Sequence, residues 1–296
     1  MPVALYARNT PTNHPDYITA IYNTLKEYHI PLYICESYYR YLKQQFSFTI
    51  DTPIITHTDD FIKYNIDVLL SLGGDGTLLE TLSLIKKHAI PVFGINTGKL
   101  GFLTYDFNNN IYESIQRIIH KEYTIEKRNL LELLYPTDHI SDINFALNEI
   151  VIHKRDTGSM LYIDVLIDDS YLTTFFTDGV IVATATGSTA YSLSCGGPIL
   201  EPSLDAMIIT PIASHSLNAR PIVISNQHIL SFKIYGRNPQ YILSLDARNY
   251  TPQIDFSKNT IQITRASHHF NLIVPHPNHF FESLKNKLYW GSDKRF

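Results

Sequence analysis

The spacing of the apolar residues changes near residue 105, and this change limits the folds open to the chain more than any other feature. Before it, short apolar runs have the length of buried strands, at residues 3–7, 32–34, 66–72 and 91–96. Segments of helical spacing lie between them, at residues 16–25, 38–46 and 77–88, with Asp16 as the expected cap of the first. This alternation predicts an α/β domain with a parallel sheet over residues 1–105.

Beyond residue 105 we predict a helix at 110–121, followed by short runs rich in β-branched and aromatic residues. The runs lie at residues 130–134, 145–153, 162–167, 171–176, 180–184, 221–224, 228–235, 241–245, 260–264 and 270–274. Short strands at such spacing predict an all-β, sandwich-like domain over residues 106–277. A last segment of helical spacing at 278–290 is expected to pack back on the first domain.

Length and composition agree with two globular domains. The chain has 296 residues, and a domain has about 100–200. Its formal net charge of −4 gives no global attraction to nucleic acid or to an anionic membrane, so we expect neither as a partner. Its two cysteines, Cys35 and Cys195, are too few for a disulfide framework. No continuously apolar stretch reaches the roughly 18 residues of a spanning helix, and we expect a cytoplasmic protein.

The most informative local sequence is Gly73-Gly74-Asp75-Gly76-Thr77, which follows a buried-strand run and opens a helical one. Glycines let backbone N–H groups approach phosphate oxygens, and the helix start adds its positive dipole end. The turn has neither the lysine of a Walker A loop nor the third glycine of a dinucleotide fingerprint. Arg8-Asn9-Thr10 after the first strand also argues against an ordinary NAD-dependent dehydrogenase. We predict a phosphate-binding turn, with a plain strand-to-helix turn as the alternative.

An aspartate among phosphate-binding amides opposes the charge of the ligand unless it has a chemical task. The natural task is to accept a proton from a hydroxyl group that attacks a phosphoryl group. Asp75 is therefore the candidate general base of a phosphotransferase.

Together with later motifs, this turn resembles the signature of the NAD kinase family. The matching blocks, in the family's order, are residues 73–77, 94–103, 148–149, 178–179, 186–194, 196–198, 215–217 and 220–221. The Thr-Gly-Ser-Thr-Ala-Tyr sequence at 186–191 separates this family from lipid kinases, which share the glycine turn. Two blocks depart from the family: Thr184-Ala185-Thr186-Gly187 replaces its Thr-Pro-Thr-Gly, and Asp246-Ala247-Arg248 replaces its Asp-Gly-Gln.

The resemblance implies an N-terminal α/β domain of Rossmann-like character and a C-terminal all-β, sandwich-like domain, with the ligand between them. It implies transfer of the γ-phosphoryl group of ATP to the 2′-hydroxyl of the adenosine ribose of NAD, which gives NADP. Mg²⁺ or another divalent cation is expected with the ATP, and no metal site of the protein's own. The family also implies a homo-oligomer. Dimer or tetramer, and polyphosphate as a donor in place of ATP, stay open.

By the same resemblance, Asp75 is the proton acceptor, and Gly73, Gly74, Gly76 and Thr77 hold the phosphates of ATP. The expected NAD contacts are Asp75, Gly76, Asn148, Glu149, Ser159, Asp178, Thr186, Thr189, Ala190, Tyr191, Ser192, Leu193, Ser194 and Ala213. Arg248 replaces a nucleotide-contacting glutamine, and a cation there is suited to a phosphate. The histidines at 268, 269, 276 and 279 lack the spacing of a metal site and are expected at the surface.

Asn148 and Glu149 interrupt an apolar run, where polar side chains are costly unless they have partners. An asparagine amide can pair with an adenine edge, and a carboxylate can accept from two neighbouring sugar hydroxyls. The residues alone leave open a turn cap at Asn148 and a strand-end salt bridge at Glu149, and the resemblance favours NAD binding.

Two other functions stay open. A lipid or sphingoid kinase shares the Gly-Gly-Asp-Gly turn, but the sequence lacks an evident apolar or basic helix for membrane docking. A non-catalytic NAD-binding sensor is the alternative from a different class, and the intact Asp75 argues against it.

Overall fold

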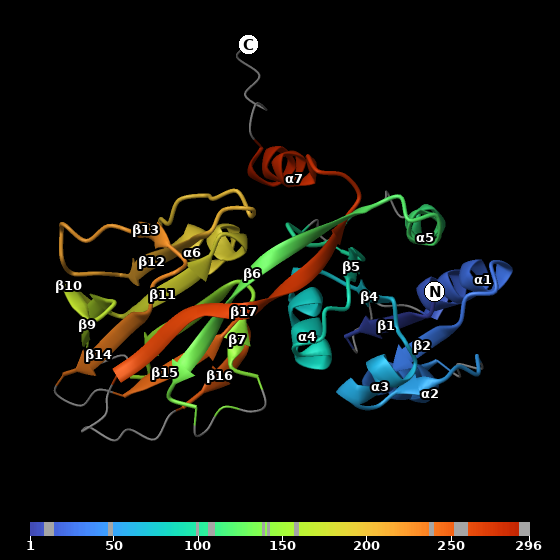
Figure 1. Cartoon of the computed structure of the whole chain (residues 1–296), viewed down its shortest axis with the longest axis horizontal. Coiled ribbons are helices and arrows are strands. Elements are labelled where there is room, and N and C mark those ends of the chain that lie inside the picture. The colour runs from blue at the N-terminus through green and yellow to red at the C-terminus, as the bar shows by residue number, and fades with distance from the viewer. Residues whose placement is uncertain are drawn as a thin grey trace, which may run out of the picture. The chain divides into compact units, whose positions relative to one another are not determined.

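The chain forms two compact units in a computed structural model (Figure 1). One unit comprises Met1–Lys127 with Asn271–Phe296, and the other comprises Arg128–Phe270. The structure describes residues 1–8, 15–46, 50–98, 101–105, 110–137, 140, 143–156, 160–236, 240–251 and 260–289. The domain boundaries predicted from the sequence lie after residues 105 and 277 instead. Separate folding of domains with those boundaries stays a prediction.

The first unit is built on a parallel sheet. Its strands, in spatial order, are β3 (Ile54–Ile55), β2 (Leu32–Cys35), β1 (Val3–Ala7), β4 (Val68–Leu72) and β5 (Val92–Ile95). Each neighbouring pair is parallel. Every residue of β4 and β5 is buried, as is typical of central parallel strands covered on both faces.

Helices connect and cover these strands. They are α1 (Pro15–Glu27), α2 (Glu36–Gln45), α3 (Thr58–Lys63), α4 (Asp75–Ile85), α5 (Ile111–Ile119) and α7 (His279–Leu288). The predicted inward face of α1 is buried at Ile18, Ile21 and Leu25. Asp16 lies inside the first turn of α1 rather than at its cap, so that detail of the prediction was wrong. Strand β3 and helix α3 are only two and six residues long, and neither was predicted from the sequence.

The second unit contains two sheets that share one apolar core. The six-stranded antiparallel sheet has the order β13 (Ile222–Ser225), β12 (Ala206–Ile212), β11 (Gly179–Thr184), β8 (Glu149–Lys154), β15 (Tyr241–Leu245) and β16 (Arg248–Tyr250). The strands of the other, 11-stranded sheet that lie largely in this unit are β10 (Ser170–Thr177), β9 (Leu161–Ile167), β14 (Leu230–Tyr235), β17 (Thr260–Val274), β6 (Thr124–Tyr135) and β7 (Phe145–Ala146). Buried valine, leucine and isoleucine side chains from both sheets form the core. The predicted α/β plus sandwich-like fold class is confirmed.

Three details of the second unit differ from the sequence expectation. The runs at 260–264 and 270–274 belong to one strand, β17. The run at 145–153 is divided into β7 and β8, and the break falls at Leu147-Asn148. The buried strand β12 and the three-residue strand β16 were missed, and so were a 3₁₀ turn, η1 (Thr186–Thr189), and a single helical turn, α6 (Tyr191–Ser194). The break and the two turns carry predicted site residues.

None of the helices that the structure describes has the length and apolar character needed to cross a membrane.

Candidate functional site

The glycine-rich turn joins β4 to α4 in the first unit. Gly73 has a φ of 147°, a backbone conformation that favours glycine, and a Cβ atom there would lie 2.9 Å from the Cβ of Thr77. The N–H of Gly73 donates to the carbonyl of Ile95, and the N–H groups of Thr77 and Leu78 donate to the carbonyl of Gly74. Helix α4 therefore begins at Asp75, and the N–H groups of Asp75 and Gly76 precede its first intrahelical bond. The turn has the backbone of an anion-binding site.

The half-buried Asp75 carboxylate is held by the segment after β5. Its Oδ2 accepts from the N–H of Phe102 at 2.7 Å, and its Oδ1 accepts from the N–H of Leu103 at 3.1 Å. The hydroxyl of Thr104 also donates to Oδ1, at 2.9 Å. A carboxylate offers about four acceptor sites, so these three bonds orient Asp75 and leave capacity for a substrate hydroxyl.

The second sequence block, residues 94–103, supports this arrangement. The Asn96 amide donates to the Thr104 hydroxyl at 2.9 Å and its oxygen accepts from the N–H of Gly98 at 2.7 Å, so a relay leads from Asn96 through Thr104 to Asp75. A Cβ atom on Gly101 would overlap the Asp75 carboxyl group. Sequence reasoning recognised the block but assigned no role to Asn96, Gly101 or Thr104. Lys99 and Leu100 lie outside the described residues.

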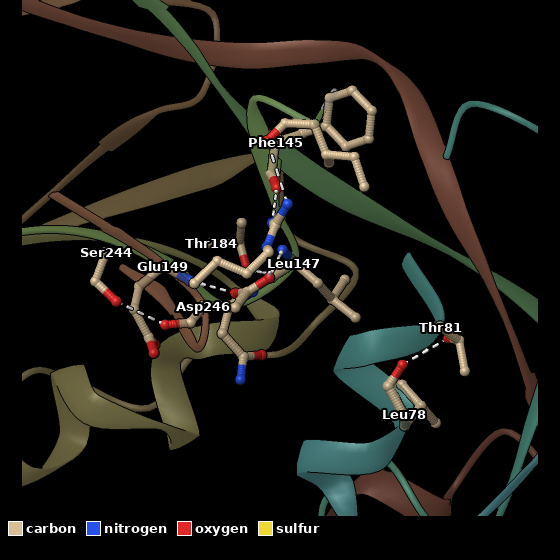
Figure 2. A network of polar contacts seen from close by, with 11 residues as sticks. Leu78, Thr81, Phe145, Leu147, Glu149, Thr184, Ser244 and Asp246 are labelled. Atoms are coloured by element: carbon tan, nitrogen blue, oxygen red, sulfur yellow. Dashed lines mark hydrogen bonds and ion pairs between the residues drawn. The ribbon is translucent and has the colours of Figure 1, made fainter. Parts of the chain in front are cut away.

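In the second unit, Asp246 shapes the turn that carries Asn148 and Glu149. The Asp246 carboxylate is buried and accepts from three successive N–H groups, of Leu147 at 2.9 Å, Asn148 at 2.8 Å and Glu149 at 3.3 Å (Figure 2). These bonds replace the ladder pairing that the break between β7 and β8 interrupts. The predicted carboxylate and amide therefore share one rigid turn.

Arg248 completes this network through backbone carbonyls of the same unit. Its guanidinium donates to the carbonyls of Ile143, at 3.2 Å, and Phe145, and one nitrogen lies 3.9 Å from a carboxylate oxygen of Asp246. Only 23% of its side chain is exposed. The structure thus gives the residue that departs from the family pattern a role within the protein.

Glu149 has the most perturbed environment among the predicted NAD contacts. Desolvation by burial, and then the neighbouring Asp246, raise the pKa of its carboxyl group to about 8, although a hydrogen bond from the backbone of Tyr191 opposes the rise. Its Oε2 is buried without a hydrogen-bond partner among the described residues. A buried polar atom without a partner is costly, so this oxygen marks a place where a ligand would supply the missing bond.

The block at 186–194 folds as η1 and α6 beside Asn148. The Thr184 hydroxyl donates to the carbonyl of Leu147 at 2.7 Å and accepts from the N–H of Gly187 at 3.0 Å. A side chain on Gly187 would collide with the Asn148 backbone, so the glycine permits the close packing. Thr184 and Gly187 flank the substituted Ala185, and the loop has a defined structure despite the missing proline.

The predicted contacts in this block point in two directions. Thr186 and Ser192 are buried, and their hydroxyls bond to Arg128 and Thr210 respectively. Tyr191 and Ser194 are exposed, and Thr189, Ala190 and Leu193 are half-buried. The hydroxyls of Thr186 and Ser192 thus have partners within the protein, and contact with NAD stays a prediction for all seven residues.

Asp178 lies between β10 and β11, close to the predicted contact Ala213. Its carboxylate forms a 2.7 Å ion pair with Lys154, and its N–H donates to the carbonyl of Ile212. Sequence reasoning missed Lys154 because a lysine at a strand end is commonplace. The predicted contact Ser159 lies outside the described residues.

The structure therefore assembles two groups, each within its own unit. The first joins residues 73–77 to residues 96–104, and the second joins Asn148, Glu149, the 184–194 segment and Asp246. Among the described residues, no cluster of three or more His, Cys, Asp or Glu side chains is arranged to hold a metal ion. His276 pairs with Glu282 at 3.3 Å, and His279 contacts the hydroxyl of Ser283.

Two family models match the chain. The model of the ATP-NAD kinase N-terminal domain matches residues 18–123, and that of the ATP-NAD kinase C-terminal domain matches residues 147–274. The NAD kinase of Porphyromonas gingivalis is 39% identical to the chain over 293 residues, which cover 99% of each protein. The NAD kinase of Bacteroides fragilis is 34% identical over 297 residues, which cover 100% of each.

Solved structures share the fold. Yeast NADH kinase complexed with NADH matches with a TM-score of 0.81 and 28% identity, over 100% of this chain and 89% of that one. An NAD kinase from Archaeoglobus fulgidus in complex with ATP matches with a TM-score of 0.75 over 96% of this chain and 99% of that one. Its identity is 24%, so this second likeness concerns the fold alone.

Proposed function

The chain belongs to the NAD kinase family and phosphorylates NAD to NADP, and from this premise we propose which of its residues carry out the reaction. The γ-phosphoryl group of ATP is transferred to the 2′-hydroxyl of the adenosine ribose. This activity requires a proton acceptor for the hydroxyl, a site for the phosphates and a site for the dinucleotide.

Asp75 is the proposed proton acceptor, and one observation carries this assignment. Its carboxylate stands at the first residue of α4, oriented by three donors, beside amides suited to phosphate. As the 2′ oxygen attacks the γ-phosphorus, the bond from that phosphorus to the β-γ bridging oxygen breaks and the hydroxyl proton passes to Asp75. Positioning matters more than basicity in such a transfer, and the donors from residues 102–104 supply it.

Gly73, Gly74, Gly76 and Thr77 are the proposed phosphate contacts of ATP. The start of α4 at Asp75 supports this assignment, because it presents a positive helix end and the N–H groups of Gly74 and Gly76. The N–H groups of Gly73 and Thr77 also donate to the carbonyls of Ile95 and Gly74. Mg²⁺ usually keeps several waters and stays on the substrate phosphates. We propose that the divalent cation binds with ATP, where it neutralises phosphate charge.

NAD is the proposed ligand of the second group. The unpartnered Oε2 of Glu149 supports a contact with ribose hydroxyls, which donate hydrogen bonds. Asn148 and the accessible residues Thr189, Ala190, Tyr191, Leu193 and Ser194 are proposed to contact the rest of the dinucleotide, with Asp178, Ala213 and Ser159. A cytoplasmic homo-oligomer is proposed from the family, and light scattering would measure its size.

Incubation of the purified full-length chain with ATP, Mg²⁺ and NAD tests the proposal. We expect NADP, detected with an NADP-specific dehydrogenase, and parallel reactions with polyphosphate and with NADH would define the donor and acceptor. Phosphorylation of a lipid or sphingoid base instead, or tight NAD binding without turnover, would contradict it and favour the corresponding alternative.

A further inference from the structure

The only charged side chain of the glycine-rich turn, Asp75, has the wrong sign for an anionic ligand. ATP adds several negative charges, so a cation beside the turn would reduce the repulsion and stabilise the transferred group. Arg8 provides one. Its Nη2 donates to the carbonyl of Gly76 at 3.2 Å, and a Cβ atom added to Gly76 would lie 3.3 Å from its Nη1.

The parallel sheet explains why Arg8 lies there. Strands β1 and β4 are neighbours, and Ala7 pairs with Leu72 at their last residues. Arg8 therefore leaves the sheet beside Gly73, at the carboxyl ends of the strands, where ligands bind in open α/β sheets. The two residues are 65 positions apart in sequence, so no motif links them.

Glu80 and Tyr6 orient the guanidinium. Arg8 Nη2 lies 2.7 Å from Glu80 Oε1, and the Tyr6 hydroxyl donates to Glu80 Oε2 at 2.7 Å. Burial raises the pKa of Tyr6, which therefore stays a neutral donor, and the bond to Glu80 raises the pKa of Arg8. About 40% of the Arg8 side chain is exposed, so its planar fork remains accessible to a ligand.

We propose that Arg8 is a further residue of the ATP site, whose guanidinium contacts the phosphates of a nucleotide bound at the glycine-rich turn. This inference rests on the proposed phosphate role of that turn. Arg8 takes no proton, because the 2′-hydroxyl proton passes to Asp75. It stabilises the charge on the phosphates as the bond to the γ-phosphorus breaks. Glu80 is a positioning residue that acts through Arg8.

Two substitutions separate a ligand contact from a structural ion pair. Arg8→Met and Glu80→Gln both break the pair, but only the first removes the cation. For Arg8→Met we expect the KM for ATP to rise about tenfold or more, or kcat to fall as much, because charge-assisted bonds to phosphate are lost. We expect a smaller effect for Glu80→Gln and a partial one for Arg8→Lys, which keeps the charge without the fork. The KM for NAD should stay within about twofold in all three.

Arg40→Met is the matched control. Arg40 forms a 2.7 Å ion pair with Glu36 on α2 but is 69% exposed. The inference is overturned if Arg8→Met keeps the ATP kinetics of Arg40→Met, or if Arg8→Met and Glu80→Gln cause equal losses. The inference is also overturned if Arg8→Met raises the KM for NAD as much as the KM for ATP and lowers the Tm in parallel. Absence of NADP with the unsubstituted chain would instead show failure of the proposed function, and with it of this role.

Discussion

At the scale of single residues, the two carboxylates proposed to act on NAD differ in what surrounds them. Asp75 is half-buried and accepts three hydrogen bonds. Glu149 is buried, and one of its oxygens has no partner among the described residues. Substitutions at the two residues therefore report on different properties, the phosphoryl transfer at Asp75 and the response to pH at Glu149.

Asp75→Asn should lower kcat by about 100-fold or more, because a positioned base contributes about 10²- to 10⁴-fold. The amide also presents a donor where Phe102 and Leu103 donate. NAD affinity, measured by calorimetric titration, should change little. Asp59→Asn, in the exposed first turn of α3, is the control. A kcat near that of the control would remove Asp75 from its proposed role.

Glu149→Gln should change how stability depends on pH. The folded-state pKa of about 8 exceeds the ordinary value of 4.5, so the folded protein binds this proton more tightly than the unfolded chain. The associated stability is present below about pH 4.5 and is lost as pH rises to about 8. A glutamine does not titrate, so the variant does not lose this stability. The Tm of the variant minus the Tm of the wild type should therefore increase from pH 5 to pH 9. A Tm difference independent of pH would contradict the assignment.

At the scale of elements, each proposed site depends on a segment distant in sequence. The segment after β5 orients Asp75 at the start of α4, and the residues after β15 orient the turn between β7 and β8. Each contact crosses between elements through backbone groups. Single-residue substitutions in these supporting segments should therefore lower the catalytic rate or the NAD affinity.

Gly101→Ala should reduce kcat strongly, because its Cβ would overlap the Asp75 carboxyl group and displace it. Gly98→Ala is the matched control in the same segment, since a Cβ there meets no atom of the described residues within 4 Å. Steady-state kinetics of both variants would measure the difference. Equal activities would show that the Asp75 position tolerates the displacement.

Arg248→Met should destabilise the second unit by about 3 kcal/mol, because it removes the donor to the carbonyls of Ile143 and Phe145 and the guanidinium beside the buried Asp246 carboxyl group. NAD affinity should fall with it, since Asp246 shapes the Asn148-Glu149 turn. Urea unfolding and NAD titration provide the two measurements. Arg265→Met, at an exposed arginine of β17 whose Nη1 lies 3.8 Å from Asp205 Oδ1, is the control. An unchanged unfolding free energy would exclude the supporting role.

At the scale of the whole molecule, the first unit is completed by the last described residues of the chain, which are the end of β17 and helix α7. Leu272 of β17 pairs with Val92 of β5, and α7 buries Phe280 and Leu284. A chain that ends at Phe270 should therefore have a less stable first unit, since each buried apolar side chain contributes about 1.5–3 kcal/mol. Thermal unfolding with and without ATP would measure this, and a chain that ends at Tyr289 is the control. Equal Tm values would contradict the expectation.

Much of the fold and of the candidate site could be predicted. The parallel strands, the helices at 77–88 and 110–121, the last helix and most β-rich runs are present within a few residues. The glycine turn and the blocks at 148–149 and 186–194 identified the family, which the relatives confirm. The two-residue β3 and the single turns η1 and α6 were missed because such short elements have no periodicity to detect.

The sequence by itself determined the α/β and β-rich halves, the phosphate turn and the family, because periodicity, glycine sterics and motif spacing act locally. Only the tertiary structure decided what surrounds the reactive groups. Asp75 accepts from residues 27 to 29 positions later, Asn148 donates to an aspartate 98 positions later, and Arg8 meets Gly76 68 positions away. These long-range hydrogen bonds form because the loops at the ends of neighbouring strands meet at one edge of a sheet. The spatial proximity of two such loops leaves no pattern in the sequence.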